Sequence, residues 1–473
     1  MLGRASSPSR SDVVVVSNRG PLDFSPGAQG RPSLKRASGG LVVALGPGVT
    51  SSGALWVAAA LSDADREAAA QANAAGAVID AEGFRVRSLS IDPGDFVAYC
   101  DVVANGTLWY LNHGLWDLVR RPRFDRHWHD AWARYRKVNR HFADAVADGA
   151  TDGATVIVHD YHLALVAGMV AARRPDLRTA TFIHTPWCTA EELSVLPDEA
   201  GAELLGTMAD GGPCGFHSQR WATRFQACAA EVVGRRPETF VAPAAVDTDE
   251  LSRVASSPAC AAELARLDAA LGDRAFIVRV DRIELSKNIL RGLWAFDALL
   301  DAHPQLVEGV VFGVFVYPSR LTLVDYQAYG QEIITLVDYL NAKWSTATWT
   351  PVLLDSEDNH PRSVAALRRY DVLVVNPVRD GLNLVAVEGP EINERHGTVV
   401  LSRQAGCYDL IGEQVLGINP FDVKATAEAM AAALALPAAE RASRARALRA
   451  VTAELTPRTW WDQLIAGAGQ SRR

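Results

Sequence analysis

The chain has 473 residues, 49% of them hydrophobic and 22% charged, which is the composition of an ordinary globular protein. A chain of this length is too long for one hydrophobic core, so we expect two domains or more. The formal net charge of −8 at pH 7 argues against nucleic acid as a partner, and an anionic substrate would have to be held by local arginines.

The sequence carries no sign of a membrane or secreted protein. Residues 1–12 are polar, unlike a signal peptide, and no apolar run approaches the ~20 residues that span a bilayer. The six cysteines lack C-x-x-C spacing, so we expect reduced thiols in a cytoplasmic protein and no zinc site. They are Cys100, Cys188, Cys214, Cys228, Cys260 and Cys407.

The first half of the chain alternates apolar strands with helical segments. We expect disorder over residues 1–12, then a strand at 13–16 that ends near Arg19, and a glycine turn at 38–40 before a helix or strand. Ser62 is placed to cap a helix over 63–75, residues 105–116 are typical of an aromatic, sugar-facing loop, and residues 123–148 form an amphipathic helix.

Two further strands, at 155–158 and 179–183, end in polar clusters that contain Asp160 and His184. Alternating strands and helices indicate a doubly wound parallel sheet, in which ligands bind beyond the carboxyl ends of the strands. Arg19, Asp160 and His184 are therefore candidate site residues. A lone histidine is usually structural, but two successive polar strand ends favour a site.

The pattern breaks near residues 232–243, and a second α/β run follows. We predict an N-terminal domain at 13–235, a C-terminal domain at 236–455 and a closing helix at 456–473 that packs back on the N-terminal domain. In the second run, a strand at 275–280 precedes Arg282 and Lys287, which would supply a planar fork and a point charge to a diphosphate. The alternative is a surface ion pair with Glu284.

Residues 372–389 predict the floor of that site. A buried strand at 372–375 turns at Asp380 and Gly381 into a helix whose N–H groups could face a phosphate. Glu388 would lie two turns into the helix, where a carboxylate could accept both hydroxyls of a ribose. We find no metal-binding motif, P-loop or nucleophile elbow, so we expect neither metal nor cofactor.

Seven stretches together resemble trehalose-6-phosphate synthases, the retaining, metal-independent enzymes of glycosyltransferase family 20. They are VVSNR (15–19), SGGL (38–41), VHDYHL (158–163), IHTPWCT (183–189), RIELSK (282–287), PVRDGLNLVAVE (377–388) and NPFD (419–422). The resemblance covers nearly the whole chain. It implies a GT-B fold, in which two Rossmann-like doubly wound domains face across a cleft, and glucose transfer from a nucleotide diphosphate to glucose 6-phosphate.

The resemblance also implies roles for matching residues. Those expected to be catalytic are Arg282, Lys287, His184 and Asp160. Those expected at the acceptor and its phosphate are Arg19, Trp109, Asp160 and Arg320. Those expected at the donor are Gly40, Asp358, Asp380, Gly381, Leu382, Asn383, Leu384 and Glu388. In the implied front-face mechanism the leaving diphosphate takes the acceptor's proton, and no enzyme nucleophile is needed.

The chain departs from the family pattern in several places. Glu284 and Asn288 stand where the family has aspartate and glycine, and cysteine falls at the acceptor-loop tyrosine near Tyr99. The Trp-Pro-x-x-His pattern is altered after Trp109, the Pro-x-Gly-Ile-Asp stretch reads PAAVD (243–247), and Pro390 interrupts the helix after Glu388. These changes leave the acceptor open.

Residues 354–360 (LDSEDNH) correspond to a segment that lies beside the nucleotide base of the donor in the family, so they bear on which base is bound. Guanine presents adjacent N–H donors that pair well with a carboxylate, whereas uracil has one. Asp355, Glu357 and Asp358 therefore predict a preference for GDP-glucose over UDP-glucose, unless these acids only cap the next helix.

Two other functions remain open. A pseudo-glycosyltransferase would couple a nucleotide-cyclitol to an amino-cyclitol phosphate, and a sugar-phosphate-binding regulator would have no turnover. A homo-oligomer is also left open, because nothing in the sequence gives an oligomeric state.

Overall fold

The structure is a computed structural model, and it describes residues 10–25, 33–37, 40–74 and 78–469. The chain divides into two compact units: Met1–Ala245 with Pro457–Arg473, and Val246–Thr456. Of the predicted disordered segment 1–12, residues 1–9 lie outside the described part, and the prediction is wrong at 11–12, where β1 begins.

The first unit is built on an eight-stranded sheet with the order β10-β9-β8-β7-β1-β4-β6-β5, parallel except for the pair β5–β6. The strands are β1 (Ser11–Arg19), β4 (Leu55–Ala59), β5 (Ile79–Ala81), β6 (Phe84–Leu89), β7 (Ala150–His159), β8 (Arg178–Ile183), β9 (Cys214–Phe216) and β10 (Thr239–Val241). A hairpin of β2 (Leu22–Ser25) and β3 (Ser33–Arg36) stands apart from this sheet.

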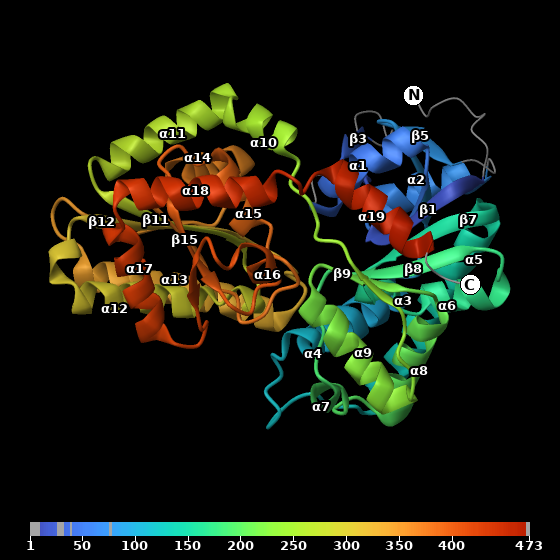
Figure 1. Ribbon diagram of the computed structural model, residues 1–473. Coiled ribbons are helices and arrows are strands. Elements are labelled where there is room, and N and C mark those ends of the chain that lie inside the picture. The colour runs from blue at the N-terminus through green and yellow to red at the C-terminus, as the bar shows by residue number, and fades with distance from the viewer. Residues whose placement is uncertain (1–9, 26–32, 38–39, 75–77, 470–473) are drawn as a thin grey trace. The chain divides into compact units, whose positions relative to one another are not determined.

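Helices cover both faces of the first sheet, with α1 and α19 on one face and α5 and α6 on the other (Figure 1). From β1 the sheet extends through β4 and β6 to β5, and from β7 it extends the other way through β8 and β9 to β10, so the topological switch point lies between β1 and β7. The helices are α1 (Gly40–Ser52), α2 (Asp63–Ala74), α3 (Pro93–Val97), α4 (Trp109–His113), α5 (Arg126–Gly149), α6 (Val166–Arg173), α7 (Ala190–Leu193), α8 (Asp198–Asp210), α9 (Gln219–Val233) and α19 (Pro457–Gly469), with a π-helix at Ala98–Leu108 and a 3₁₀ turn at Tyr161–Leu163.

The second unit has a six-stranded, all-parallel sheet with the order β13-β12-β11-β14-β15-β16. Counted along the chain, this is the doubly wound order 3-2-1-4-5-6, with the switch point between β11 and β14. The strands are β11 (Ala275–Arg282), β12 (Val310–Tyr317), β13 (Val352–Asp355), β14 (Val372–Val375), β15 (Thr398–Ser402) and β16 (Leu416–Ile418). They read as nearly continuous apolar runs because helices cover both faces.

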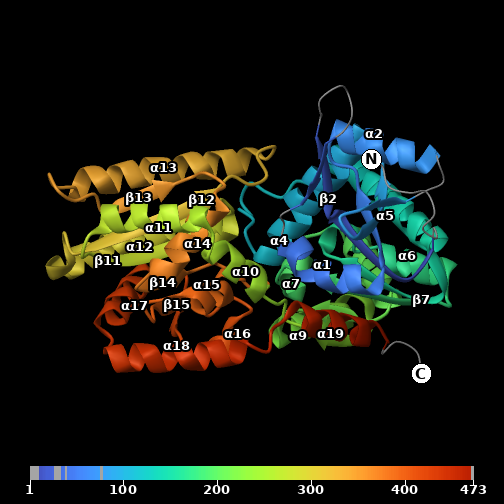
Figure 2. The same ribbon diagram turned by 90° about the horizontal axis from the view of Figure 1, so that it is seen from above.

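On one face of the second sheet lie α11, α14, α15 and α18, and on the other lie α12, α13 and α17 (Figures 1 and 2). The helices are α10 (Thr248–Ala255), α11 (Pro258–Leu271), α12 (Ile289–Ala302), α13 (Val324–Trp344), α14 (His360–Arg369), α15 (Val385–Ile392), α16 (Tyr408–Ile411), α17 (Val423–Ala435) and α18 (Ala438–Thr452), with 3₁₀ turns at Leu285–Lys287 and Pro304–Leu306.

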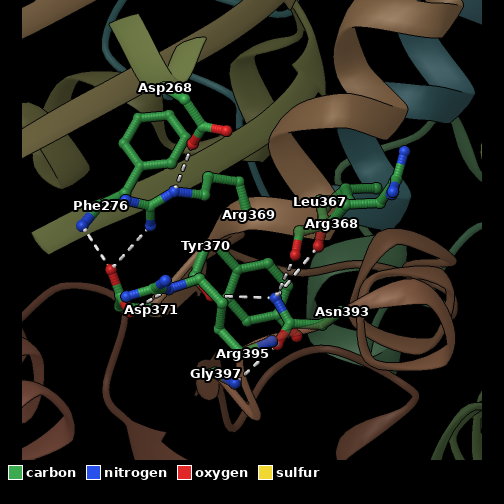
Figure 3. Close-up of polar contacts among 10 residues, drawn as sticks. All are labelled: Asp268, Phe276, Leu367, Arg368, Arg369, Tyr370, Asp371, Asn393, Arg395 and Gly397. Atoms are coloured by element: carbon green, nitrogen blue, oxygen red, sulfur yellow. Dashed lines mark hydrogen bonds and ion pairs between the residues drawn. The ribbon is translucent and has the colours of Figure 1, made fainter. Parts of the chain in front are cut away.

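A polar network closes the amino-terminal ends of β11 and β14 (Figure 3). Asn393 donates to the carbonyls of Leu367 (3.1 Å) and Tyr370 (2.9 Å) at the end of α14, and its oxygen accepts from the Gly397 N–H (2.7 Å). Asp371 accepts from the Phe276 N–H (2.9 Å) and from two arginine side chains. The network satisfies backbone groups that would otherwise be buried unpaired.

The predicted domain boundary is ten residues too early. β10 pairs in parallel with β9 of the first sheet, so residues 236–245 belong to the first unit and not to the second. Helix α19 also belongs to the first unit, the one on which the sequence predicts it to pack.

The aromatic stretch 105–116 is another correction. It is not a loop, because residues 98–113 form the π-helix followed by α4, and most of their side chains are buried. The six cysteines, in contrast, are all buried and none forms a disulfide, as the thiol prediction requires. Within the described residues, none of the helices is both long and apolar enough to cross a bilayer.

Candidate active site

The second unit places two predicted residues in direct contact at its switch point. Lys287 follows β11 and Asp380 follows β14, and Lys287 Nζ lies 2.6 Å from Asp380 Oδ2. Burial lowers the pKa of Lys287, but Asp380, Asp281 and Glu284 outweigh burial and raise the pKa above its ordinary value. Lys287 is therefore a fixed cation at the place where open α/β sheets bind ligands.

Arg282 is the last residue of β11, and Arg320 follows the neighbouring strand β12. Arg282 Nη2 lies 3.1 Å from Glu284 Oε1, and its side chain is still half exposed. The Arg320 guanidinium donates to the Tyr326 hydroxyl (2.6 Å). The pair with Glu284, the expected alternative to a diphosphate role, is thus present, but it leaves much of Arg282 accessible.

Glu284 fills the place of the family's aspartate without losing the carboxylate. Its side chain is buried, and besides pairing with Arg282 it can accept from the Ser319 hydroxyl at 3.5 Å. The Glu284 charge also raises the pKa of Arg282, which keeps that guanidinium charged.

Asn288 explains the missing glycine after Lys287. Its backbone is left-handed, with φ 59° and ψ 40°, a conformation that asparagine tolerates better than other residues with a side chain. Its side-chain amide donates to the carbonyls of Asn376 (2.9 Å) and Pro420 (2.8 Å). The asparagine that stands in place of glycine therefore links three loop ends, those at residues 288, 376 and 420.

Arg279 is a buried residue that positions Lys287, and the sequence analysis does not predict it. Its guanidinium is fully buried in β11 and contacts Asp281 Oδ2 (2.7 Å), Asn376 Oδ1 (3.2 Å) and the carbonyl of Lys287 (2.9 Å). It thereby holds the turn that carries Lys287 against the end of β14. An arginine inside the apolar run AFIVRVDR was the available signal.

The donor stretch 380–388 differs from the expected strand–turn–helix. Helix α15 begins only at Val385, and Asp380, Gly381, Leu382, Asn383 and Leu384 form an irregular turn before it. Asn383 adopts a positive φ of 80° and donates to Asp380 Oδ2 (3.1 Å). The turn is held to residues 404–407 by backbone bonds, such as that from the Cys407 N–H to the Leu382 carbonyl (3.0 Å).

Glu388 lies in the first turn of α15, not two turns into it. Burial raises the pKa of Glu388 to about 7, and its carboxyl group has no hydrogen-bond or ion-pair partner within the described residues. Pro390 does not prevent the helix, which continues to Ile392 and then ends.

The acids of residues 354–360 are mostly engaged. Asp355 is paired with Arg362, which also lies 3.8 Å from Glu357, and the helix α14 is capped by Asn359. Asp358 is exposed and makes no side-chain hydrogen bond within the described part of the chain. Beside this segment is a cavity of about 230 Å³, lined by Glu263, Arg266, Leu267, Phe315, Leu353, Leu354, Asp355 and Arg362.

The first unit brings Arg19 and Asp160 to the ends of the adjacent strands β1 and β7. The side chain of Arg19 is two-thirds exposed, and its nearest carboxylate, Asp23, lies 3.8 Å away. β1 is irregular between Ser17 and Arg19, as strands often are next to functional sites. This edge could therefore present a cation to an anionic ligand.

Asp160 adopts φ 72° and ψ 167°, a region of backbone space that is essentially reserved for glycine. Its carboxylate accepts from the backbone N–H of His184 (3.2 Å). Two predicted site residues are thus joined, and one of them is held under backbone strain.

His184 belongs to a row of three histidines at the ends of β7, β8 and β9, in which His159 and His217 are buried and His184 is partly exposed. His159 Nδ1 lies 3.0 Å from His184 Nε2, and His184 Nδ1 lies 3.1 Å from His217 Nε2. Burial lowers the pKa of all three rings, so they are neutral. Trp460 of α19 packs against His159 and His184.

The structure does not test the predicted roles of Trp109 and Gly40. Trp109 is only 2% exposed and stacks on His113 with the ring centres 4.2 Å apart, so the structure shows it packed and its role beside a phosphate stays a prediction. Gly40 opens α1, but the preceding Ser38 and Gly39 lie outside the described residues. No group of three or more His, Cys, Asp or Glu side chains that could hold a metal occurs in the described ranges.

Comparisons with known proteins agree with this arrangement. The chain is 32% identical over 468 residues to "Trehalose-6-phosphate synthase" of Mycolicibacterium vanbaalenii, covering 93% of this chain and 92% of that protein. It is 29% identical to "Validamine 7-phosphate valienyltransferase" of Streptomyces hygroscopicus subsp. jinggangensis, covering 97% of this chain and 94% of that one.

Among solved structures, one described as "Trehalose-6-phosphate from E. coli bound with UDP-2-fluoro glucose" is 26% identical, with a TM-score of 0.84 over 97% of this chain and 99% of that one. The fold is therefore GT-B, with two Rossmann-like units. The model of glycosyltransferase family 20 matches residues 11–469, and the chain belongs to that family.

Proposed function

We propose that this protein is a retaining glucosyltransferase that transfers glucose from a nucleotide diphosphate glucose to glucose 6-phosphate, forming α,α-trehalose 6-phosphate. The observation that carries the proposal is the largely buried pair of Lys287 and Asp380, beside Arg282, at the switch point of a Rossmann-like sheet. The relative from M. vanbaalenii, which bears the name of this activity, supports it.

The donor half of the reaction is assigned to the second unit. Lys287 uses one of its three N–H donors on Asp380, so two remain for a diphosphate, and Arg282 adds a planar fork. Asp380 and the backbone of 381–384 would hold the glucose hydroxyls and phosphate, and Glu388 the ribose. The acceptor half is assigned to Arg19 and Asp160 of the first unit and to Arg320 of the second.

The reaction follows from these assignments without an enzyme nucleophile. The bond from the glucose anomeric carbon to the diphosphate oxygen breaks, and the acceptor hydroxyl attacks from the same face. Its proton passes to the departing diphosphate oxygen. Arg282 and Lys287 neutralise the charge that grows on the diphosphate, which is the largest contribution expected of the protein. We propose that no metal ion takes part.

For the donor base we propose guanine over uracil. Asp355 is paired with Arg362, and the exposed Glu357 lies 3.8 Å from the same guanidinium, so the preference rests on Asp358, an exposed acid with no ion pair among the described residues. Two adjacent N–H donors of guanine would pair with its carboxylate. Measuring kcat/KM for both donors tests this: GDP-glucose should be preferred, and Asp358→Asn should reduce the preference. A clear advantage of UDP-glucose contradicts it.

The reaction itself is tested by incubating the purified protein with glucose 6-phosphate and each nucleotide-glucose. A non-reducing phosphorylated disaccharide is the expected product. The relative from S. hygroscopicus is the reason to include an amino-cyclitol phosphate with a nucleotide-cyclitol as a second pair. Turnover of that pair alone would make the protein a pseudo-glycosyltransferase, and binding without turnover of either pair would make it a regulator.

A further inference from the structure

The two hydrogen bonds in the row His159–His184–His217 run in one direction, because a backbone N–H fixes the tautomer of His217 at one end of the row. The N–H of Ala244 donates to Nδ1 of His217 at 3.2 Å. A backbone N–H can only donate, so Nδ1 of His217 has to accept and its ring proton is on Nε2. The ring is neutral, since burial lowers the pKa of His217 to about 3.

The direction passes along the row one ring at a time. The Nε2–H of His217 donates to Nδ1 of His184, so the single proton of neutral His184 is on Nε2. That proton is donated to Nδ1 of His159, and the last proton of the row is on Nε2 of His159. His159 Nε2 is buried and has no hydrogen-bond partner in the described part of the chain, so no described group at that end opposes the direction set by Ala244.

One competing arrangement exists. The Ala242 carbonyl also lies within reach of the His217 ring and could accept a hydrogen bond from a protonated Nδ1, which would reverse the row. That carbonyl already accepts from the Nε1–H of Trp460 at 3.1 Å. In addition, the reversed row would point the Nδ1–H of His217 at the Ala244 N–H, two donors facing each other at 3.2 Å.

We propose that His217 is a positioning residue, which holds His184 as the neutral ring protonated on Nε2. This rests on the proposed function in one respect, the place of His184 at the donor sugar. The Nε2–H of His184 can then donate to a sugar hydroxyl in place of His159 Nδ1. Nδ1 of His184 still accepts from His217. It serves as a fixed polar contact and not as the base of the reaction.

The tautomers can be read directly from ¹⁵N NMR of protein labelled in its histidine rings, with the His184 signals assigned by their loss in His184→Gln. In the unsubstituted protein we expect His184 to be neutral, with a bare Nδ1 and a protonated Nε2. A His184 protonated on Nδ1 would overturn the proposal. This measurement needs no turnover, so its failure is distinct from a failure of the proposed function.

Matched substitutions at the two ends of the row test the direction. His217→Leu should let His184 take both tautomers and lower kcat/KM by about tenfold, the order of one lost hydrogen bond. His217→Gln, whose side-chain amide can donate from the position of Nε2, should restore the single tautomer and most of that loss. His159→Leu should leave the tautomer of His184 unchanged, because the proton placement is set from the other end.

The opposite pattern contradicts the proposal. If His159→Leu mixed the tautomers of His184 and His217→Leu did not, the row would be polarised from His159. If the two leucine variants had equal effects on the tautomer, the histidines would only pack. Should His217→Leu fail to fold, the tautomer of the unsubstituted protein and the behaviour of His217→Gln still decide between these outcomes.

Discussion

Asp160 combines a carboxylate with a backbone conformation that suits glycine, and such strain of about 1–3 kcal/mol persists where the surrounding structure holds the residue in place for function. The carboxylate is fixed by the backbone N–H of His184, so the strained turn aims it beyond the end of β7. Strain and a strand-end carboxylate at one residue support a role at the acceptor.

The pair of variants Asp160→Gly and Asp160→Ala separates these two properties. Both remove the carboxylate, and we expect both to lose activity by orders of magnitude. Only glycine relieves the backbone, so Asp160→Gly should unfold at higher denaturant than Asp160→Ala, with a difference of about 1–2 kcal/mol after the extra chain entropy of glycine. Equal stability of the two variants would show that position 160 carries no strain.

Lys287 is expected to act on the transition state, because the diphosphate charge grows as the glycosidic bond breaks. Lys287→Ala should lower kcat by about 10²–10³, the range for loss of one oxyanion-stabilising donor. It also leaves Asp380 buried without its cation, so the double variant with Asp380→Ala should be more stable than Lys287→Ala alone. Near-normal turnover of Lys287→Ala would remove the diphosphate role.

Glu388 predicts a pH dependence of donor binding. Its pKa is raised to about 7 by burial, and the ionised carboxylate is the form that accepts two ribose hydroxyls. Binding should therefore release a proton, and affinity for nucleotide-glucose without acceptor should rise as the pH increases through 7. Titration calorimetry between pH 6 and 8 measures this, with Glu388→Gln as the control, which should bind more weakly and without that pH dependence.

At the scale of elements, the sheet in each unit follows from strand composition. The runs at 372–375 and 398–401 were predictable as buried strands because parallel sheets covered on both faces need apolar residues at every position. The aromatic stretch 105–116 was not predictable as helix, since its glycines and its lack of period conceal a π-helix, and the start of α15 depends on backbone bonds to residues 404–407.

The candidate residues were predictable where polar side chains lie at the end of an apolar strand or within a few residues after it, as at Arg19, Asp160, Lys287 and Asp380. It was not predictable where side chains from different strands meet. The pairing of Arg279 with Asn376 and the row through His159 and His217 join residues far apart in the chain, and no local period reports such contacts.

The network of Asn393 and Asp371 should support the second unit without touching the chemistry. It lies at the amino-terminal ends of β11 and β14, the opposite ends from Lys287 and Asp380. Asn393→Ala leaves buried carbonyls and N–H groups unpaired, so stability should fall by roughly 2–4 kcal/mol, while kcat of the folded fraction stays unchanged. Glu394→Ala, which removes only an exposed pair with Arg368, should cost less than about 1 kcal/mol.

At the scale of the whole molecule, each unit carries its own set of candidate residues. The first carries Arg19, Asp160 and the histidine row, and the second carries the cations that would neutralise a departing nucleotide. A net charge of −8 makes these cations local exceptions in an acidic protein, so recognition of an anionic donor depends on them and not on the overall field.

The central claim is that glucose is transferred from the nucleotide to glucose 6-phosphate with retention, and that protein cations, without a metal ion, stabilise the departing diphosphate. It is tested most directly by treating the protein with a chelator, supplying GDP-glucose or UDP-glucose with glucose 6-phosphate, and determining the anomeric configuration of the product by proton NMR. The account predicts full activity and a product with both anomeric centres α. A β centre, or activity that is lost with chelator and returns with Mn²⁺, would contradict it.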